Sequence, residues 1–234
     1  AMAFSRLFPG ETTDALAVNG LGFKIGSATV NDLFSALGGA TSFNAAQVQN
    51  VYGIAGPEFA AMRNSVLQQP GSFNGIYIES ASILPPNYGG HGASQMTDSL
   101  ALYSLYAKLA PSLSLDSITQ LLQNASSTVE RSLESALDAL RAVLLGASAL
   151  TTTKTATDNR DALYSTLAAL QSSAEYRALQ GSAALRLTAV QGRDELVTKA
   201  KSDFGHFLAV KYLLPVAIEG AAGILSGVHG NLYT

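Results

Sequence analysis

The sequence predicts a mainly α-helical protein, a helical bundle with long helices in residues 114–228 and a small β element in residues 20–84. The first observation behind this prediction is that apolar residues in residues 114–146 recur at steps of three and four. That period places them on one stripe of a helix, with the charged residues off the stripe. The second observation is that 13 of the 21 glycines precede Pro111, whereas residues 112–214 contain no proline. We therefore expect short helices and strands separated by turns in the first part, and a series of helices in the second.

The elements of the first part are short. In chain order we expect a strand or hairpin arm, three helices and a second strand, over residues 21–30, 32–39, 44–52, 57–68 and 76–84. The two strands are rich in β-formers with near alternation of apolar and polar residues. Asn31 and Asp32 are N-cap residue types, Gly38 is a typical helix stop, and Pro57 fits a first helical turn.

The second part contains longer periodic segments. We expect helices over residues 95–110, 114–146 and 158–179, a further helical piece over 181–192, and a helix over 193–214. Asp116 and Gly146 provide start and stop signals for the second of these. Residues 124–128 (NASST) are poor helix formers, so they would kink this helix or split it in two.

The most apolar stretch of the chain is residues 204–228. Lys211, Pro215 and Glu219 interrupt it, and a single transmembrane helix needs about 20 apolar residues without such breaks. We therefore expect a buried helical hairpin that closes the core, with a membrane-inserting hairpin as the alternative. The residues that would serve either role are Phe207, Leu213, Leu214, Pro215, Ile218 and Ile224.

Composition excludes several classes of function. The net charge is −3, only 13% of residues are charged, and lysine and arginine form no cluster, which argues against nucleic-acid binding. Cysteine is absent, so disulfides, thiol nucleophiles, cysteine-bound zinc and iron–sulfur clusters are excluded. The N-terminal residues lack the apolar core of a signal peptide.

The loop at residues 85–94 is the most site-like stretch. Its glycines allow close approach of a ligand, and Tyr88 and His91 are a residue pair that can ligate haem. The competing interpretation is a polar surface loop. Ser94 beside His91 raises a serine hydrolase as a further alternative, but the glycine that a nucleophile elbow needs after the serine is missing. We predict Tyr88, His91 and Ser94 as ligand-binding residues, with no catalytic residue and no metal site.

Residues 201–216 (KSDFGHFLAVKYLLPV) resemble helical segments in the non-repeat regions of large bacterial proteins exported by type I secretion, of the RTX toxin and adhesin kind. The resemblance implies a secreted, non-enzymatic N-terminal helical module active in virulence, and the alternative location is the cytoplasm. Its partners would be other domains of the same chain and a membrane or host surface. Residues 1–234 would then form one domain of a larger protein, with a mixed part at 1–111 and a long-helix part at 112–234.

Overall fold

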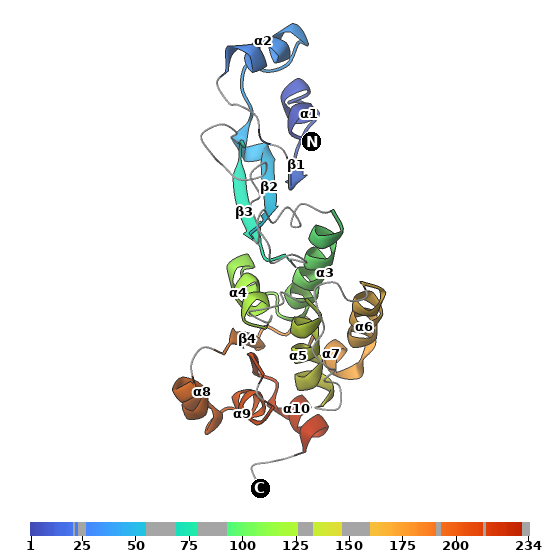
Figure 1. Ribbon diagram of the computed structural model, residues 1–234, viewed down its shortest axis with the longest axis vertical. Coiled ribbons are helices and arrows are strands. Elements are labelled where there is room, and N and C mark those ends of the chain that lie inside the picture. The colour runs from blue at the N-terminus through green and yellow to red at the C-terminus, as the bar shows by residue number, and fades with distance from the viewer. Residues whose placement is uncertain are drawn as a thin grey trace, which may run out of the picture. The chain divides into compact units, whose positions relative to one another are not determined.

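The computed structural model describes residues 1–20, 22, 27–54, 69–78, 93–125, 133–146, 160–190, 193–212 and 214–230 (Figure 1). The chain divides into two compact units. The first unit comprises Ala1–Ile78 with Leu84–Met96, and the second comprises Glu79–Ile83 with Thr97–Thr234. A single domain stays a prediction, because compact contacts alone do not establish which parts fold independently.

The first unit is built on a parallel sheet in the order β1-β2-β3. The strands are β1 (Ala15–Val18), β2 (Val48–Gly53) and β3 (Ser72–Ile76), and the helical elements are α1 (Met2–Leu7), α2 (Ala28–Ala36) and the 3-10 turn η1 (Ala45–Gln47). Met2 packs with Ala15, Ala17 and Val48 in a small core that Phe43 partly covers. This core joins α1 to the sheet.

Arg6 links α1 to the segment around α2. The residue is 3% exposed, and its guanidinium donates to the carbonyl oxygens of Ala40 (3.0 Å) and Thr41 (2.8 Å) and to Asn31 Oδ1 (2.6 Å). It also lies 4.4 Å from the centre of the Phe34 ring. A buried charge is tolerated when its donors are satisfied in this way, so Arg6 is a structural residue.

The structure corrects three predictions in the first unit. Ala28–Val30 lie in α2, which Ser27 caps by accepting a hydrogen bond from the Val30 amide (3.2 Å), so the strand expected at 21–30 does not extend to residue 30. The helix expected at 44–52 is wrong, since η1 is followed by β2, whose backbone pairs with strands on both sides. The strand expected at 76–84 contains only Ile76 of β3. Residues 57–68 and 79–84 lie outside the described residues.

The second unit contains the longer helices. These are α3 (Ala93–Leu109), α4 (Leu115–Ala125), α5 (Leu133–Leu145), α6 (Arg160–Ser172), α7 (Ala174–Leu179), α8 (Arg193–Ala200), α9 (Phe204–Lys211) and α10 (Ala222–His229). Helix α5 contacts α4, α6 and α10 and buries nearly all of its residues, including Glu134 and Asp138. Arg141 Nη1 lies 3.0 Å from Asp138 Oδ1. The core of this unit therefore surrounds α5.

A mainly α-helical fold with small sheets is confirmed, whereas a bundle with long helices is not. The helix expected at 95–110 matches α3. The stretch at 114–146 contains α4 and α5, with residues 126–132 outside the described part, and Gly146 (φ +97°) ends α5 as expected. The helix expected at 158–179 is broken at Ser173, whose side chain caps α7.

Two further predictions are wrong because of a second sheet. Strands β4 (Arg186–Ala189) and β5 (Val216–Glu219) pair antiparallel, so residues 181–192 are not a helical piece and residues 204–228 are not a helical hairpin. Pro215 cannot continue α9, and the β-branched Val216 and Ile218 then extend along β4.

The hairpin residues nevertheless contribute to the interior of the second unit. Leu214 and Ile218 are buried, and Phe207, Pro215 and Ile224 are half-buried, whereas Leu213 lies outside the described residues. Among the helices that the structure describes, none is both long and apolar enough to cross a membrane. The described part of residues 204–228 therefore forms a helix, a strand and a second helix.

Candidate functional site in the second unit

The residues predicted to bind a ligand do not form a site in the described structure. Tyr88 and His91 lie outside the described residues, so haem binding at their loop stays a prediction. Ser94 is exposed in the first turn of α3. The candidate site comes instead from the second unit.

This site, which we call the β4 pocket, is a hollow of about 200 Å³ between β4, α8 and α9. Its lining residues are Thr188, Ala189, Val190, Glu195, Leu196, Lys199 and His206. In an antiparallel pair, residues opposite each other project to the same face of the sheet. Because Thr188 is opposite Ala217 and Arg186 is opposite Glu219, the side chains of Thr188 and Glu219 share the face on which α9 packs.

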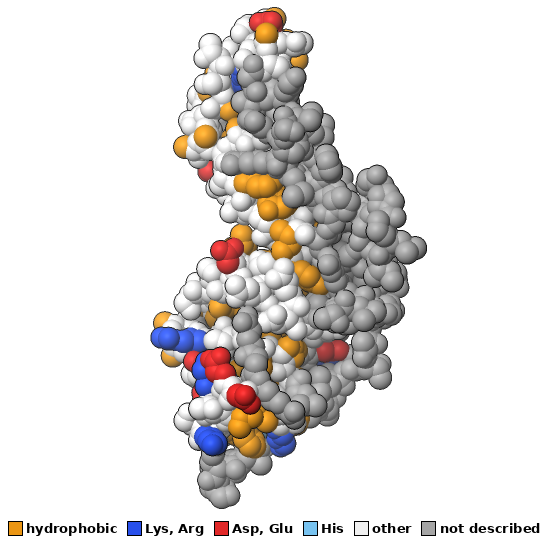
Figure 2. Space-filling view, turned by 60° about the vertical axis from the view of Figure 1, so that its left-hand side comes forward, with side chains coloured by type: hydrophobic (Ala, Val, Ile, Leu, Met, Phe, Trp, Pro, Cys, Tyr) orange, Lys and Arg blue, Asp and Glu red, His pale blue; other side chains and the backbone are white. Residues whose placement is uncertain are grey.

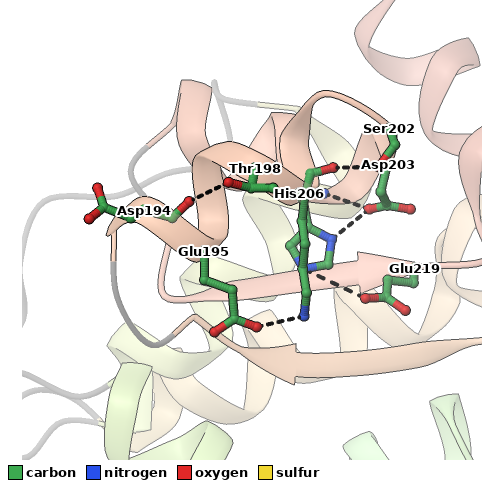
Figure 3. Close-up of polar contacts among 8 residues, drawn as sticks. Asp194, Glu195, Thr198, Ser202, Asp203, His206 and Glu219 are labelled. Atoms are coloured by element: carbon green, nitrogen blue, oxygen red, sulfur yellow. Dashed lines mark hydrogen bonds and ion pairs between the residues drawn. The ribbon is translucent and has the colours of Figure 1, made fainter.

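His206 is held from both sides (Figure 3). Asp203 caps α9, and its Oδ1 accepts a hydrogen bond from the His206 backbone amide (2.8 Å) while lying 2.7 Å from His206 Nδ1. On the other side of the ring, Nε2 lies 3.6 Å from Glu219 Oε1 on β5. The His206 side chain is only 4% exposed, so the ring has one fixed orientation at the wall of the pocket.

Lys199 and Glu195 form the second charged pair of the β4 pocket. Lys199 Nζ lies 3.1 Å from Glu195 Oε1, one turn earlier on α8. The hydrogen bond and charge of Glu195, followed by the charges of Glu219 and Asp203, raise the pKa of Lys199 above its usual value. Lys199 is therefore a cation and not a nucleophilic amine at neutral pH. Figure 2 shows acidic and basic side chains lying close together on the lower part of the face drawn.

Thr188 supplies an unpaired polar atom. Its Oγ1 is buried and has no hydrogen-bond partner within the described structure. A buried hydroxyl without a partner costs about 1–3 kcal/mol, and a rotation of the half-buried Thr188 side chain toward the hollow would let a ligand bond to Oγ1 and remove this cost. The apolar side chains of Val190 and Leu196 line the same hollow. The pocket thus offers an apolar wall and a few convergent polar groups, as small-molecule sites do.

The geometry favours binding over chemistry. A carboxylate bonded to histidine Nδ1 can orient a general base, but here Nε2 faces the Glu219 carboxylate and not a hydroxyl. The described residues contain no group of three or more histidine and acidic side chains that could hold a metal ion. Asp203 three residues before His206 was the only signal in the sequence, and the pairing of β4 with β5, which brings Glu219 to His206, could not be read from it.

A second histidine has a structural role. His229 Nε2 lies 2.6 Å from the Val143 carbonyl oxygen and must therefore donate to it, which leaves Nδ1 to accept from the Tyr212 hydroxyl at 3.3 Å. These contacts connect α10 to α5 and α9.

Comparisons of the chain with protein-family models, with curated proteins and with solved structures found no match.

Proposed function

We propose that the protein is a non-enzymatic binding module that holds a small polar molecule in the β4 pocket. The observation that carries this proposal is the buried, unpaired Thr188 hydroxyl beside a hollow whose histidine is already held in place. Asp203 and Glu219 orient His206, whereas the exposed Lys199 only pairs with Glu195. Binding a ligand then requires no reordering of His206, which favours affinity.

The size of the pocket limits the ligand. Pockets for drug-sized ligands have volumes of about 300–1,000 Å³, so a hollow of about 200 Å³ suits a smaller molecule. Such a molecule could contact Leu196 and Val190 with its apolar part and Thr188 with a polar group.

The proposal is tested with three probes of similar size, namely butylamine, butanol and butyrate. We expect at least one of them to shift the backbone amide resonances of Thr188, Leu196 and His206 in ¹H–¹⁵N spectra. A Thr188→Met variant, which fills the hollow, should lose these shifts while its circular dichroism spectrum stays unchanged. If Thr188→Met fails to fold, a Glu195→Gln variant at the edge of the hollow is measured in the same way. No shift at these residues with any probe would contradict the proposal.

A second candidate function is contact with a membrane or host surface within a large secreted bacterial protein. Exposed apolar side chains on the first unit favour it, because clusters of such side chains usually mark interaction sites. Of the ten large apolar side chains that are exposed in the described part, seven belong to this unit: Phe4, Phe8, Leu16, Val18, Leu33, Leu37 and Ile54. The resemblance of residues 201–216 to exported proteins supports the secreted setting.

Vesicle flotation tests this second candidate. Phe4 and Phe8 are about half exposed and pack against each other with ring centres 4.8 Å apart. Burying both in lipid would contribute more than 1.4 kcal/mol, so we expect Phe4→Ser with Phe8→Ser to reduce the floated fraction about tenfold. The matched control is Leu100→Ser, an exposed apolar residue of the second unit. A wild-type protein that stays with the soluble fraction at both neutral and acidic pH would contradict the candidate.

A further inference from the structure

We propose that the β4 pocket is a site for a small ligand that carries an ammonium group, and that Lys199 Nζ occupies the position of that group in the present structure. The inference rests on the binding module proposed above and specifies the chemistry of its ligand. Three observations support it: the charges around the hollow, the exposed and weak ion pair between Lys199 and Glu195, and the unpaired Thr188 hydroxyl.

Negative charge dominates the surroundings of the pocket. Glu195 lines it, and Asp203 and Glu219 flank His206. Among the described residues that line it, Lys199 is the one lysine or arginine. Arg186, which is opposite Glu219 in the strand register, is exposed and has no ion pair with it among the described residues. Solvent screens the charge of Arg186 and that of the exposed Glu195, so the excess negative charge that favours a cation over an anion comes from Asp203 and Glu219, whose side chains are about one-third exposed.

Lys199 is held loosely enough to be displaced. The side chains of Lys199 and Glu195 are 45% and 65% exposed, so solvent screens their attraction and the pair contributes little to stability. The lysine ammonium is thus tethered beside the pocket and competes with any other cation for Glu195. A ligand ammonium, which carries three N–H donors, can take over the bond to Glu195 and use Thr188 Oγ1 as a further acceptor.

The ligand class follows from charge and size together. We expect a small primary amine, with a short apolar body for the wall formed by Leu196 and Val190. A carboxylate or phosphate of the same size would face Glu195 in a pocket already rich in negative charge. A neutral alcohol would gain the Thr188 hydrogen bond but not the charge-assisted bond to Glu195.

The experiment compares dissociation constants of butylamine, butanol and butyrate, measured by chemical-shift titration at one ionic strength. For the wild-type protein we expect butylamine to bind about two- to threefold more tightly than butanol, because only the amine forms a charge-assisted bond to the exposed Glu195. Lys199→Met removes the tethered competitor and should tighten butylamine binding about twofold, whereas the control Lys201→Met on the exposed turn after α8 should leave it unchanged. Glu195→Gln should weaken it about twofold, and the control Glu11→Gln in the first unit should not.

Different failures have different meanings. Butanol or butyrate binding as tightly as butylamine would overturn the ammonium inference while the binding module stands. Weaker butylamine binding by Lys199→Met would show that the lysine contacts the ligand and does not stand in for it, which also overturns the inference. Absence of binding by all three probes to wild type and to Lys199→Met would overturn the inference and the proposed function together.

Discussion

Replacing Gly205 by alanine is expected to lower the free energy of unfolding by about 3 kcal/mol, the upper end of the usual cost of overpacking. Gly205 lies in the first turn of α9 where this helix crosses β5. A Cβ at this position would overlap the carbonyl oxygen of Ile218 and lie 2.6 Å from its carbonyl carbon. These are backbone atoms of a paired strand, so no side-chain rotation relieves the overlap, and α9 must move away from the sheet.

Gly227→Ala and Gly223→Ala provide matched controls in the second unit. Both glycines lie in α10, and a Cβ on either would meet no atom within 4 Å. Because alanine has the higher helix propensity, we expect each substitution to stabilise the protein by about 0.5–1 kcal/mol. Urea unfolding followed by circular dichroism at 222 nm measures all three variants. A Gly205→Ala protein as stable as the controls would show that α9 does not pack on β5 as described.

The same substitution connects stability to the β4 pocket. His206 follows Gly205 directly, and its contact with Glu219 depends on how closely α9 approaches β5. Moving the helix outward would separate Nε2 from Glu219 while leaving the Asp203 cap intact, since Asp203 belongs to the same helix terminus. The orientation of His206 is therefore a product of tertiary packing and not of the local sequence alone.

Sequence reasoning succeeded where local signals decide the structure. Helix α3 and the end of α5 at Gly146 follow from apolar period and from a glycine with positive φ. Sequence reasoning failed where pairing between segments far apart in the chain decides the structure. The backbone of β2 bonds to strands about 30 residues before it and 20 residues after it, which overrides its helix-like appearance. The expected hairpin at 204–228 failed for the same reason, because β5 finds its partner in β4.

The candidate site could not be predicted from the sequence either, because it also depends on pairing between distant segments of the chain. Its residues form no sequence motif, and they meet only because two short strands pair and α9 packs on them. They are Thr188, Glu195, His206 and Glu219. Tyr88 and His91 were predicted from a local feature, namely the glycines and prolines that surround them in the sequence. A buried hydroxyl without a partner is a property of packing, and no pattern of residue types indicates it.

Two buried tyrosines are expected to make the second unit lose stability above about pH 10. The Tyr176 hydroxyl on α7 donates to the Leu105 carbonyl oxygen (3.0 Å), and the Tyr106 hydroxyl on α3 donates to the Ala136 carbonyl oxygen (3.3 Å). Both side chains are almost fully buried. Burial disfavours the phenolate, so it raises the pKa of Tyr176 to about 12 and raises the pKa of Tyr106 as well.

The sign of the effect follows from proton binding. Between pH 10 and 12 an unfolded chain has released these protons, whereas the folded protein retains them, so stability is complete below pH 10 and falls as the pH rises through 12. A pKa increase of two units at Tyr176 corresponds to about 3 kcal/mol lost over this interval. Tyr106 adds to the loss in the same direction.

Tyr106→Phe and Tyr176→Phe variants separate this effect from general alkaline denaturation. At pH 8 each variant should be about 1 kcal/mol less stable than wild type, because a buried carbonyl loses its donor. Between pH 10 and 12 the double variant should lose less stability than wild type, so the two curves of unfolding free energy against pH should converge. Curves that fall in parallel across this range would show that neither phenol is buried in the folded protein, and that α3 is not joined to α5 and α7 through these hydroxyls.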